Sequence, residues 1–227
     1  VIDGQWVSLK IKDEDVVLSP KRGSAKARDS PRRNEAAQKI TLIKANLQRT
    51  NFIILSSDYQ PELVGNKSFR LQQIRSGLLP TQINPQHFSL SFGLFQRVLD
   101  LKANLKIKAQ LEELKQKALR NPSAKDMAKT LTQMRSLIES LSIPESYLKA
   151  ILEKTEAVFG KDAILFLRST TNAEDLSNYP AAGLYNSFGN VKPTLEELAK
   201  YIKKVWASVW NERAFFDREA NSVGQES

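Results

Sequence analysis

The sequence has no cysteine and a single histidine among its 227 residues. Without cysteine there is no disulfide framework, no cysteine-ligated zinc site and no thiol nucleophile. One histidine is too few for a Ser-His catalytic pair beside a histidine-ligated metal. Any chemistry in this chain must therefore rest on other side chains.

The sequence also lacks long apolar runs and the marks of a secretory signal. No run approaches the roughly 20 apolar residues that a membrane-spanning helix needs. The chain begins at Val1, without a methionine and without a basic segment followed by an apolar one. We therefore expect a fragment of a longer protein that is neither secreted nor embedded in a membrane.

What is present is the composition of an ordinary globular chain with an excess of positive charge. With 41% hydrophobic and 26% charged residues, the chain is long enough to bury a core of its own. The formal net charge is +9, and residues 21–39 contribute +5 of it, from seven cations and two acids. That stretch has no aromatic residue and is rich in Gly, Ser, Pro and Ala, which indicates a flexible linker over 21–40 and argues against a nucleic-acid surface. A second basic run, 102–120, alternates with leucine at helical spacing, so we expect a solvent-facing side of a helix there.

Residues 1–20 predict a β-hairpin. The segment 5–11 alternates polar and apolar residues, and an acidic turn at 13–15 separates it from the apolar run 16–18. Two strands alone are only marginally stable, so we expect the hairpin to belong to a sheet that an upstream domain completes. The predicted organisation is thus a hairpin (1–20), a basic flexible linker (21–40) and the N-terminal part of a larger domain (41–227).

Periodicity within the larger region predicts both strands and helices. Phe52–Leu55 and Ala163–Leu167 are short apolar runs typical of buried strands, and we expect the second to be covered on both faces. A helix is expected over Lys67–Ile74. The predicted fold class is α+β, with a helix-rich middle over about 94–160 inserted between the strands. Three later helices carry capping signals, in which an acid follows a hydroxyl residue by three positions: Ser123 with Asp126, Ser142 with Glu145, and Thr194 with Glu197.

The segment that follows the second strand carries the residues best suited to chemistry. Arg168 is followed by the three hydroxyls of Ser169, Thr170 and Thr171, and a loop of small residues comes at 180–187. Such a strand end can offer a cation, hydroxyl donors and bare backbone N–H groups to a phosphate. Strand-end arginines and Ala/Gly loops also serve structural turns, so the pattern alone leaves both interpretations open. Neither a P-loop nor a dinucleotide-binding glycine pattern occurs, so a nucleotide site must be of another type.

Three ordered blocks carry a family resemblance: residues 167–176, 182–187 and 204–214. They resemble the nucleotide-binding (PEP/pyruvate-binding) domain of the pyruvate phosphate dikinase and phosphoenolpyruvate synthase family. Residues 63–68 are similar to the opening Gly-Gly-Lys motif of that domain, and residues 77–95 resemble the stretch that leads into its first long helix. The resemblance covers roughly residues 50–220 and is most similar to the α-glucan and phosphoglucan water dikinases.

The resemblance implies an ATP-grasp-like nucleotide-binding domain with ATP and Mg²⁺ as cofactors. In this family the β-phosphate of ATP passes to a histidine on a separate swivelling domain, AMP and phosphate are released, and the phosphohistidine phosphorylates an acceptor. The acceptor is an α-glucan in the glucan branch and a small molecule in the pyruvate branch. A plant glucan dikinase implies a plastid, and the other members imply the cytoplasm.

By matching position, the resemblance also implies site residues. Lys67 and Arg168 would be the catalytic cations that contact the ATP phosphates. The chain departs from the family at Asn186, where many members have Asp, and at Asn66, which replaces the second Gly of the opening motif. The remaining nucleotide-binding positions would be Ser169, Thr170 and Glu174 in the strand-end block, and Gly183, Leu184, Tyr185 and Ser187 in the loop over the phosphates.

Several residues have competing interpretations. Asp175 fits the family block but could equally cap a turn, and Arg213 could pair with Glu212 or Asp217. The phosphate-carrying histidine of the family lies in a Thr/Ser-His-Ala context that His87 does not share, so we expect His87 in a loop or at the surface. The carrier domain would then lie upstream, with residues 21–40 as its tether. The Mg²⁺ ligands and the adenine pocket are expected beyond Ser227.

Two other functions remain open. A pyruvate-type dikinase would use the same ATP chemistry on a small acceptor. A non-catalytic glucan- or polyanion-binding module would use Trp6, Trp206 and Trp210 as stacking platforms. Trp206 lies on an apolar helical stripe with Ile202 and Val209, which indicates a core position and leaves Trp210 and Trp6 as the plausible platforms.

Overall fold

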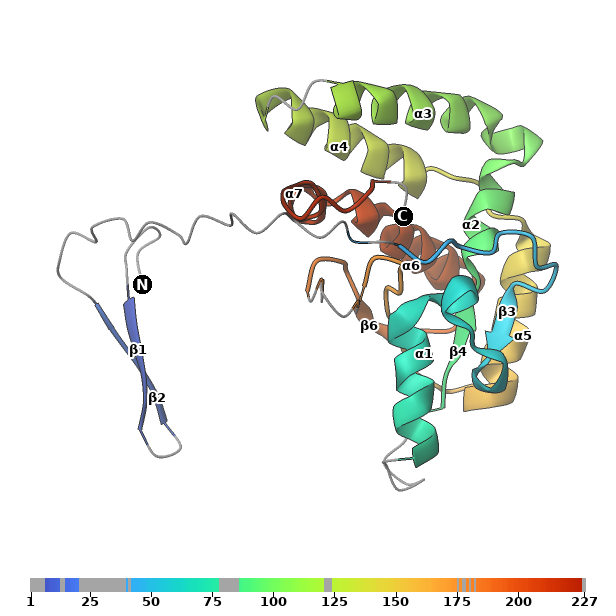
Figure 1. The fold of residues 1–227 in the computed structure, drawn as a ribbon. Helices are drawn as coiled ribbons and strands as arrows, with labels where there is room; N and C mark the ends of the chain where they lie inside the picture. Colours follow the sequence, from blue (N-terminus) through green and yellow to red (C-terminus); the bar gives the residue numbers. More distant parts are fainter. Residues whose placement is uncertain are drawn as a thin grey trace. The chain divides into compact units, whose positions relative to one another are not determined.

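A computed structural model describes residues 7–12, 15–20, 40, 42–77, 86–120, 124–174, 176, 179, 181 and 183–225. The chain divides into two compact units, Val1–Gln38 and Lys39–Ser227 (Figure 1). In the first unit, strands β1 (Val7–Lys12) and β2 (Asp15–Pro20) pair antiparallel, with Val7 opposite Pro20 and Lys12 opposite Asp15. Two strands are formed where two were predicted. The basic segment 21–39 lies outside the described residues, and the division into hairpin, linker and domain stays a prediction.

The larger unit contains two small antiparallel sheets. Strand β3 (Ile53–Leu55) pairs with β4 (Phe88–Leu90), and β5 (Leu165–Leu167) pairs with β6 (Phe188–Val191). The first strand of each pair was predicted from its apolar run. The partners β4 and β6 were not, because their mixed composition gives no strand signal.

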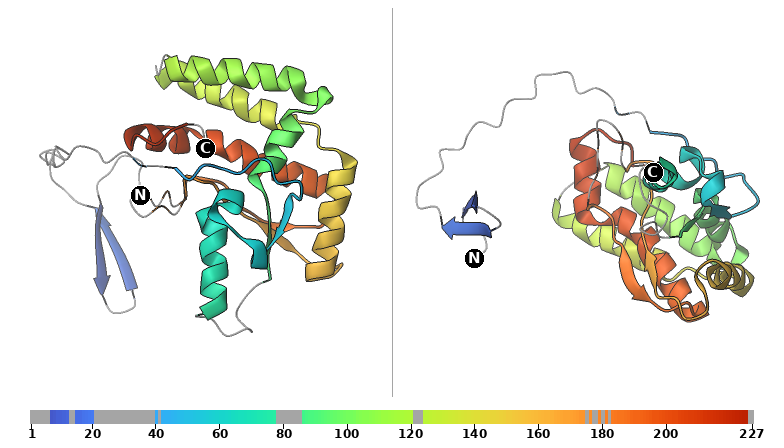
Figure 2. Two further views of the ribbon diagram at one scale, coloured as in Figure 1. Left: turned by 45° about the vertical axis from the view of Figure 1, so that its right-hand side comes forward. Right: turned by 90° about the horizontal axis from the view of Figure 1, so that it is seen from below.

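Helices make up most of the rest of this unit (Figures 1 and 2). The predicted helix-rich middle is confirmed by four successive helices, and together with the sheets they give the expected mixture of α and β structure. Short 3₁₀ turns stand at 56–58, 102–104 and 208–210. The helices are α1 (Pro61–Gly77), α2 (Phe92–Leu99), α3 (Leu105–Arg120), α4 (Ala124–Glu139), α5 (Glu145–Phe159), α6 (Leu195–Ala207) and α7 (Glu212–Ala220).

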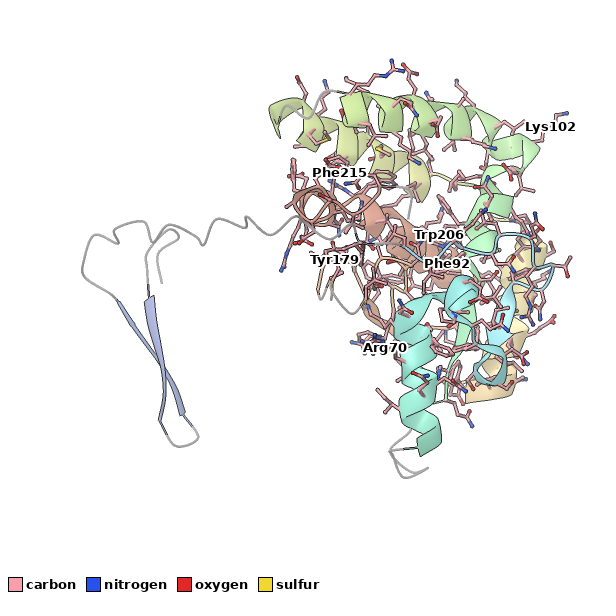
Figure 3. The ribbon with its side chains drawn as sticks, in the orientation of Figure 1. Arg70, Phe92, Lys102, Tyr179, Trp206 and Phe215 are labelled. Carbon is pink, nitrogen blue, oxygen red and sulfur yellow. The ribbon has the colours of Figure 1, made fainter. Side chains whose placement is uncertain are left out.

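The main core lies where these helices meet. Helix α4 packs against α3 and α6, and α6 also packs against α5. The predicted apolar stripes supply the buried residues, among them Leu131, Ile138, Leu198 and Ile202, each at most 4% exposed. Trp206, which Figure 3 labels, packs against this core. Its ring packs edge-on against that of Phe95, with the ring centroids 5.2 Å apart. The stripes are therefore core, as predicted.

The capping predictions had different outcomes. At α6, Thr194 is the N-cap and its side chain accepts a hydrogen bond from the Glu197 N–H, as predicted. At α5 the prediction was wrong, because the N-cap is Pro144 rather than Ser142. The buried Asn104 explains the shift: its side chain bonds both the N–H and the C=O of Ser142, which holds that residue in the preceding connection. Ser123 lies outside the described residues.

The expectation that residues 163–167 are covered on both faces was wrong. Leu165 and Leu167 pack against the main core, but Ile164 and Phe166 are 60% and 66% exposed. The strand belongs to a two-stranded sheet, and in the described part of the chain the main core covers one of its faces. An unbroken apolar run therefore indicated a buried strand where the structure has one open face.

Among the described residues, no helix combines the length and the apolar character that crossing a bilayer requires.

Candidate functional site

Helix α1 is interrupted at Gly65, and this break lies directly against the residues that follow β5. Gly65 has φ +79°, and a Cβ added there would lie 2.5 Å from Thr170 Oγ1 and 2.7 Å from the carbonyl oxygen of Thr171. The Thr170 hydroxyl donates a hydrogen bond of 2.5 Å to the carbonyl of Val64. The opening motif and residues 168–174, here called the strand-end segment, are thus joined by backbone contact that only glycine permits.

Two residues beyond Gly65, Lys67 reaches into the same segment. Its amine forms an ion pair with Oε1 of Glu174 and lies 3.4 Å from the hydroxyl oxygen of Ser169. The Ser169 hydroxyl is in turn 3.4 Å from the same carboxylate oxygen. The Glu174 side chain is only 2% exposed, whereas that of Lys67 is 26% exposed. A buried carboxylate therefore holds the Lys67 amine in place, while about a quarter of the lysine side chain remains exposed to solvent.

Local turns in the strand-end segment bury the carboxylate. The Thr171 N–H donates to Glu174 Oε2 at 3.1 Å, and the Ala173 N–H donates to the Thr171 hydroxyl at 3.1 Å. The Asn172 amide donates to the carbonyl of Ile43 at 3.1 Å. Serine, threonine and asparagine form such short backbone links readily, which is why this polar run folds into a compact turn.

Arg168 stands at the start of the segment, directly after the last residue of β5. Its side chain is exposed, and in the described part of the chain it takes no part in the Lys67 network. The structure thus joins Lys67, Ser169, Thr170 and Glu174 and leaves the second predicted cation facing solvent.

The small-residue loop at 180–187 is described at Ala181 and 183–187. Ala181 and Gly183 both have positive φ, +51° and +71°. Leu184 and Tyr185 are buried, at 5% and 7% exposed, whereas Gly183 and Ser187 are exposed. A Cβ on Gly183 would meet nothing within 4 Å, so it is the backbone conformation that favours glycine there. The side chains of Leu184 and Tyr185 anchor the loop, and the exposed residues form its outer surface.

A second buried cluster brings the three sequence blocks together. Its members come from the strand-end segment, the connection between that segment and the loop, the loop itself, helix α7 and the residues after it. Asn211, which caps α7, also donates to the side-chain oxygen of Asn186 in the loop at 3.1 Å. We call this group the loop cluster: Ala173, Tyr179, Ala181, Leu184, Tyr185, Ala214 and Val223.

Tyr179 of the loop cluster lies close to α7 (Figure 3). Burial raises the pKa of its phenol, and the Asp217 carboxylate beside it raises that pKa further. The hydroxyl is therefore neutral throughout the physiological range.

The other candidate residues take structural places wherever the structure describes them. Trp206 and Trp210 pack against the main core, and Trp6 lies outside the described residues. His87 is half-buried, with its ring centroid 5.5 Å from that of Tyr59. Glu212 lies 4.0 Å from Arg135, and Asp175 is outside the described residues. Within the described ranges, no three His, Cys, Asp or Glu side chains are grouped so that they could hold a metal ion.

Two residues that were not predicted as site residues also shape this site. Gly65 was noted only as part of a resemblance, and its contact with Thr170 depends on a residue more than 100 positions away. Arg218 stands between Asp217 and Glu219, a pattern typical of an exposed helix face, yet it is fully buried. No local signal in the sequence marks either role.

Comparison with known proteins gives consistent matches. Residues 61–227 match the family described as the pyruvate phosphate dikinase AMP/ATP-binding domain. The chain is 28% identical over 220 residues to the chloroplastic alpha-glucan water dikinase of Citrus reticulata, which covers 94% of the chain and 13% of that relative. It is 27% identical over 150 residues to a probable phosphoenolpyruvate synthase of Methanothermobacter thermautotrophicus, covering 64% of the chain and 20% of the relative.

A third match is to a protein with another named acceptor. The chain is 29% identical over 140 residues to the rifampicin phosphotransferase of Streptomyces sviceus, covering 61% of the chain and 15% of that relative. The chain thus spans between 13% and 20% of the length of these three relatives.

Proposed function

Because the chain belongs to the pyruvate phosphate dikinase AMP/ATP-binding domain family, which relates it to phosphoenolpyruvate synthases and alpha-glucan water dikinases, we propose that residues 41–227 bind ATP within a dikinase. We propose further that they form the N-terminal part of an ATP-grasp-like domain. The observation that carries this proposal is the Lys67 amine, held by a buried carboxylate at the break in α1 and beside the strand-end hydroxyls.

In the proposed site, Lys67 and Arg168 neutralise the phosphates of ATP. Phosphoryl transfer depends mainly on positioning and on compensation of negative charge, and fixed cations provide both. The Ser169 hydroxyl lies beside Lys67 and can donate to a phosphate oxygen, whereas the Thr170 hydroxyl already donates to the carbonyl of Val64 and holds the strand-end segment against the break in α1. The ion pair supports a role for Glu174 in holding Lys67 in place, because a lysine side chain otherwise has many rotamers to lose on binding.

The loop residues Gly183–Ser187 would lie over the phosphates. Gly183 and Ser187 are exposed, so their backbone and hydroxyl groups can face a ligand, while buried Leu184 and Tyr185 support the loop from beneath. Loops with left-handed residues direct successive N–H groups toward one point, which suits an anion. We include Mg²⁺ in the proposal because the resemblance to the family implies it. No ligand for Mg²⁺ is assigned among the described residues.

We propose that the full-length protein transfers the β-phosphate of ATP to a histidine on another domain, with AMP and phosphate as products. An α-glucan is the favoured acceptor, since the matches to alpha-glucan water dikinases extend over 94% of the chain. The β1–β2 hairpin would close an upstream phosphohistidine domain, and residues 21–40 would be its tether. A pyruvate-type dikinase is the alternative. The non-catalytic module loses support because Trp206 and Trp210 pack against the main core.

The decisive experiment follows the phosphates of ATP. The full-length protein is incubated with ATP labelled at either the β- or the γ-phosphate, and protein-bound label is measured. A dikinase retains the β-label and releases the γ-label as free phosphate. Transfer of the γ-label, or of neither, would contradict the proposed reaction.

Two variants test the proposed cations. Lys67→Met and Arg168→Ala should each lower the rate of β-label transfer by at least about 100-fold, because each removes a charge that stabilises the transferred phosphoryl group. Matched controls are Lys149→Met, which removes a cation from a surface ion pair on α5, and Arg120→Ala at the exposed end of α3. Rates within a few-fold of wild type for the site variants would argue against these residues.

A further inference from the structure

Helix α7 contains an arginine that is fully enclosed by the protein. Arg218 is 0% exposed, and each of its guanidinium nitrogens donates a hydrogen bond to a different part of the chain. Nε donates to Gln225 Oε1 at 2.8 Å, Nη1 to the hydroxyl of Tyr185 at 3.1 Å, and Nη2 to the carbonyl of Val209 at 2.9 Å. The guanidinium carbon also lies 5.9 Å from the centroid of the Tyr185 ring.

Burial of this arginine is costly for the fold. All three hydrogen-bond acceptors are neutral, and among the described residues no carboxylate forms an ion pair with Arg218. Removing a charge from water without a counter-ion is expensive, and an apolar side chain of similar size would fill the same space at lower cost. What the arginine adds is a rigid planar fork that can bond three segments at fixed angles.

One of these three segments is the loop that the proposed function places over the ATP phosphates. We infer that Arg218 is a positioning residue for this loop and acts on the nucleotide through Tyr185. The inference rests on the proposed function and extends it to a residue some thirty positions from the loop in the sequence.

The loop conformation is of a kind that needs such support. Ala181 and Gly183 are both in the left-handed region, which is unfavourable for alanine, so the surrounding structure must hold the loop there. Within the loop, the Tyr185 hydroxyl is bonded by Arg218 and the Asn186 side chain by Asn211. The first bond is buried and charge-assisted, so it is the stronger of the two.

Gln225 allows positioning to be separated from stability. Its side-chain oxygen accepts from Arg218, and its amide donates to the Phe215 carbonyl at 3.1 Å and to Glu219 at 2.8 Å. Gln225→Met therefore leaves one Arg218 donor without its acceptor, as Tyr185→Phe does, but leaves the loop bond intact. A merely structural role for Arg218 predicts similar effects of both variants on ATP binding.

The test is made in the full-length protein, with the KM for ATP and the kcat of β-label transfer measured together with the melting temperature. Tyr185→Phe should raise the KM for ATP about tenfold, because a hydrogen bond to a charged group contributes at least about tenfold to the equilibrium that holds the loop in its binding conformation. Gln225→Met should lower the melting temperature at least as much and leave the KM within twofold of wild type. An unchanged KM in Tyr185→Phe, or an equal rise in both variants, overturns the inference.

Lys67→Met, assayed in parallel, distinguishes a failure of the positioning role of Arg218 from a failure of the proposed ATP site. If Lys67→Met loses ATP-dependent transfer while Tyr185→Phe keeps a wild-type KM, the positioning role is wrong and the proposed site stands. If Lys67→Met retains full transfer, the proposed site is wrong and the role of Arg218 in it is overturned as well. Arg218→Met removes all three bonds at once, so Tyr185→Phe, which keeps the ring and the guanidinium, is the primary variant.

Discussion

Gly65 and Gly160 are both glycines with positive φ, but they differ in what surrounds them. At Gly65 an added Cβ would overlap Thr170 and the backbone of Thr171, whereas at Gly160, after α5, it would meet nothing within 4 Å. The conformational cost of a side chain is therefore similar at the two positions. Only Gly65 adds a steric cost, and that cost falls on the segment that carries the candidate site.

This difference gives a prediction with a built-in control. Gly160→Ala should lower the free energy of unfolding by about 1–3 kcal/mol, because its backbone (φ 89°, ψ 164°) lies in a region that residues with a Cβ scarcely occupy. Gly65→Ala should cost at least about 2 kcal/mol more, because the backbone of the strand-end segment must move. Urea unfolding of both variants measures the difference. Equal losses would show that the close contact has no energetic consequence.

Tyr179 predicts how stability changes at alkaline pH. Burial raises the pKa of its phenol in the folded state, while the unfolded chain titrates near the ordinary value of about 10. The folded state therefore holds the proton more tightly. This contribution to stability is fully present below about pH 10 and is lost as pH rises toward the folded-state pKa.

The measurement compares urea unfolding of wild type and Tyr179→Phe at about pH 9 and about pH 11. Wild type should lose more stability between the two values than the variant, which has no phenol to ionise at this position. If both proteins lose the same amount, Tyr179 does not titrate as the structure indicates.

At the scale of secondary-structure elements, local signals placed the helices better than the strands. Thr194 caps α6 as predicted because its hydroxyl needs only the N–H of Glu197, three residues away. Strands β4 and β6 were missed, since each is formed by pairing with a strand that is distant in the sequence. Ser142 shows the reverse case, in which a local capping pattern is present but does not form a cap. The side chain of Asn104, 38 residues away in the sequence, bonds the Ser142 backbone and keeps that residue out of the helix start.

The cap of α6 can be tested directly. Thr194→Ala removes the acceptor of the Glu197 N–H and should lower the free energy of unfolding by about 1 kcal/mol, or a melting temperature shift of about 2–4 °C for a chain of this size. Thr194→Ser keeps a hydroxyl in place and should stay within a few tenths of a kcal/mol of wild type. Thermal unfolding followed by circular dichroism measures both, and equal melting temperatures for the two variants would argue against the cap.

At the scale of the larger unit, two buried clusters serve different purposes. The main core joins the helices of the middle region to α6, and the loop cluster joins the strand-end segment, the loop and α7. The candidate site depends on the second cluster for its geometry and on the first for a folded framework.

The stability of the framework is tested in the main core. Leu131→Ala, on α4, should lower the free energy of unfolding by about 2–5 kcal/mol, since Leu131 is 0% exposed and its removal leaves a cavity. Leu119→Ala on α3, where the side chain is 46% exposed, should change it by no more than about 0.5 kcal/mol. Urea unfolding distinguishes the two, and a loss at Leu131 no larger than at Leu119 would contradict the assignment of the core.

The sequence by itself determined the class of fold, the positions of most helices, the apolar runs that become β3 and β5, and the motif blocks that identify the family. These features depend on spacing and side-chain type within one or two helical turns. The tertiary structure decided which strands pair, that Ile164 and Phe166 face outward, that Lys67 meets Glu174 across 107 residues, and that Arg218 is buried against Tyr185. Such contacts arise only when distant segments close on one another around a shared core, and no local pattern of residues records which segments those will be.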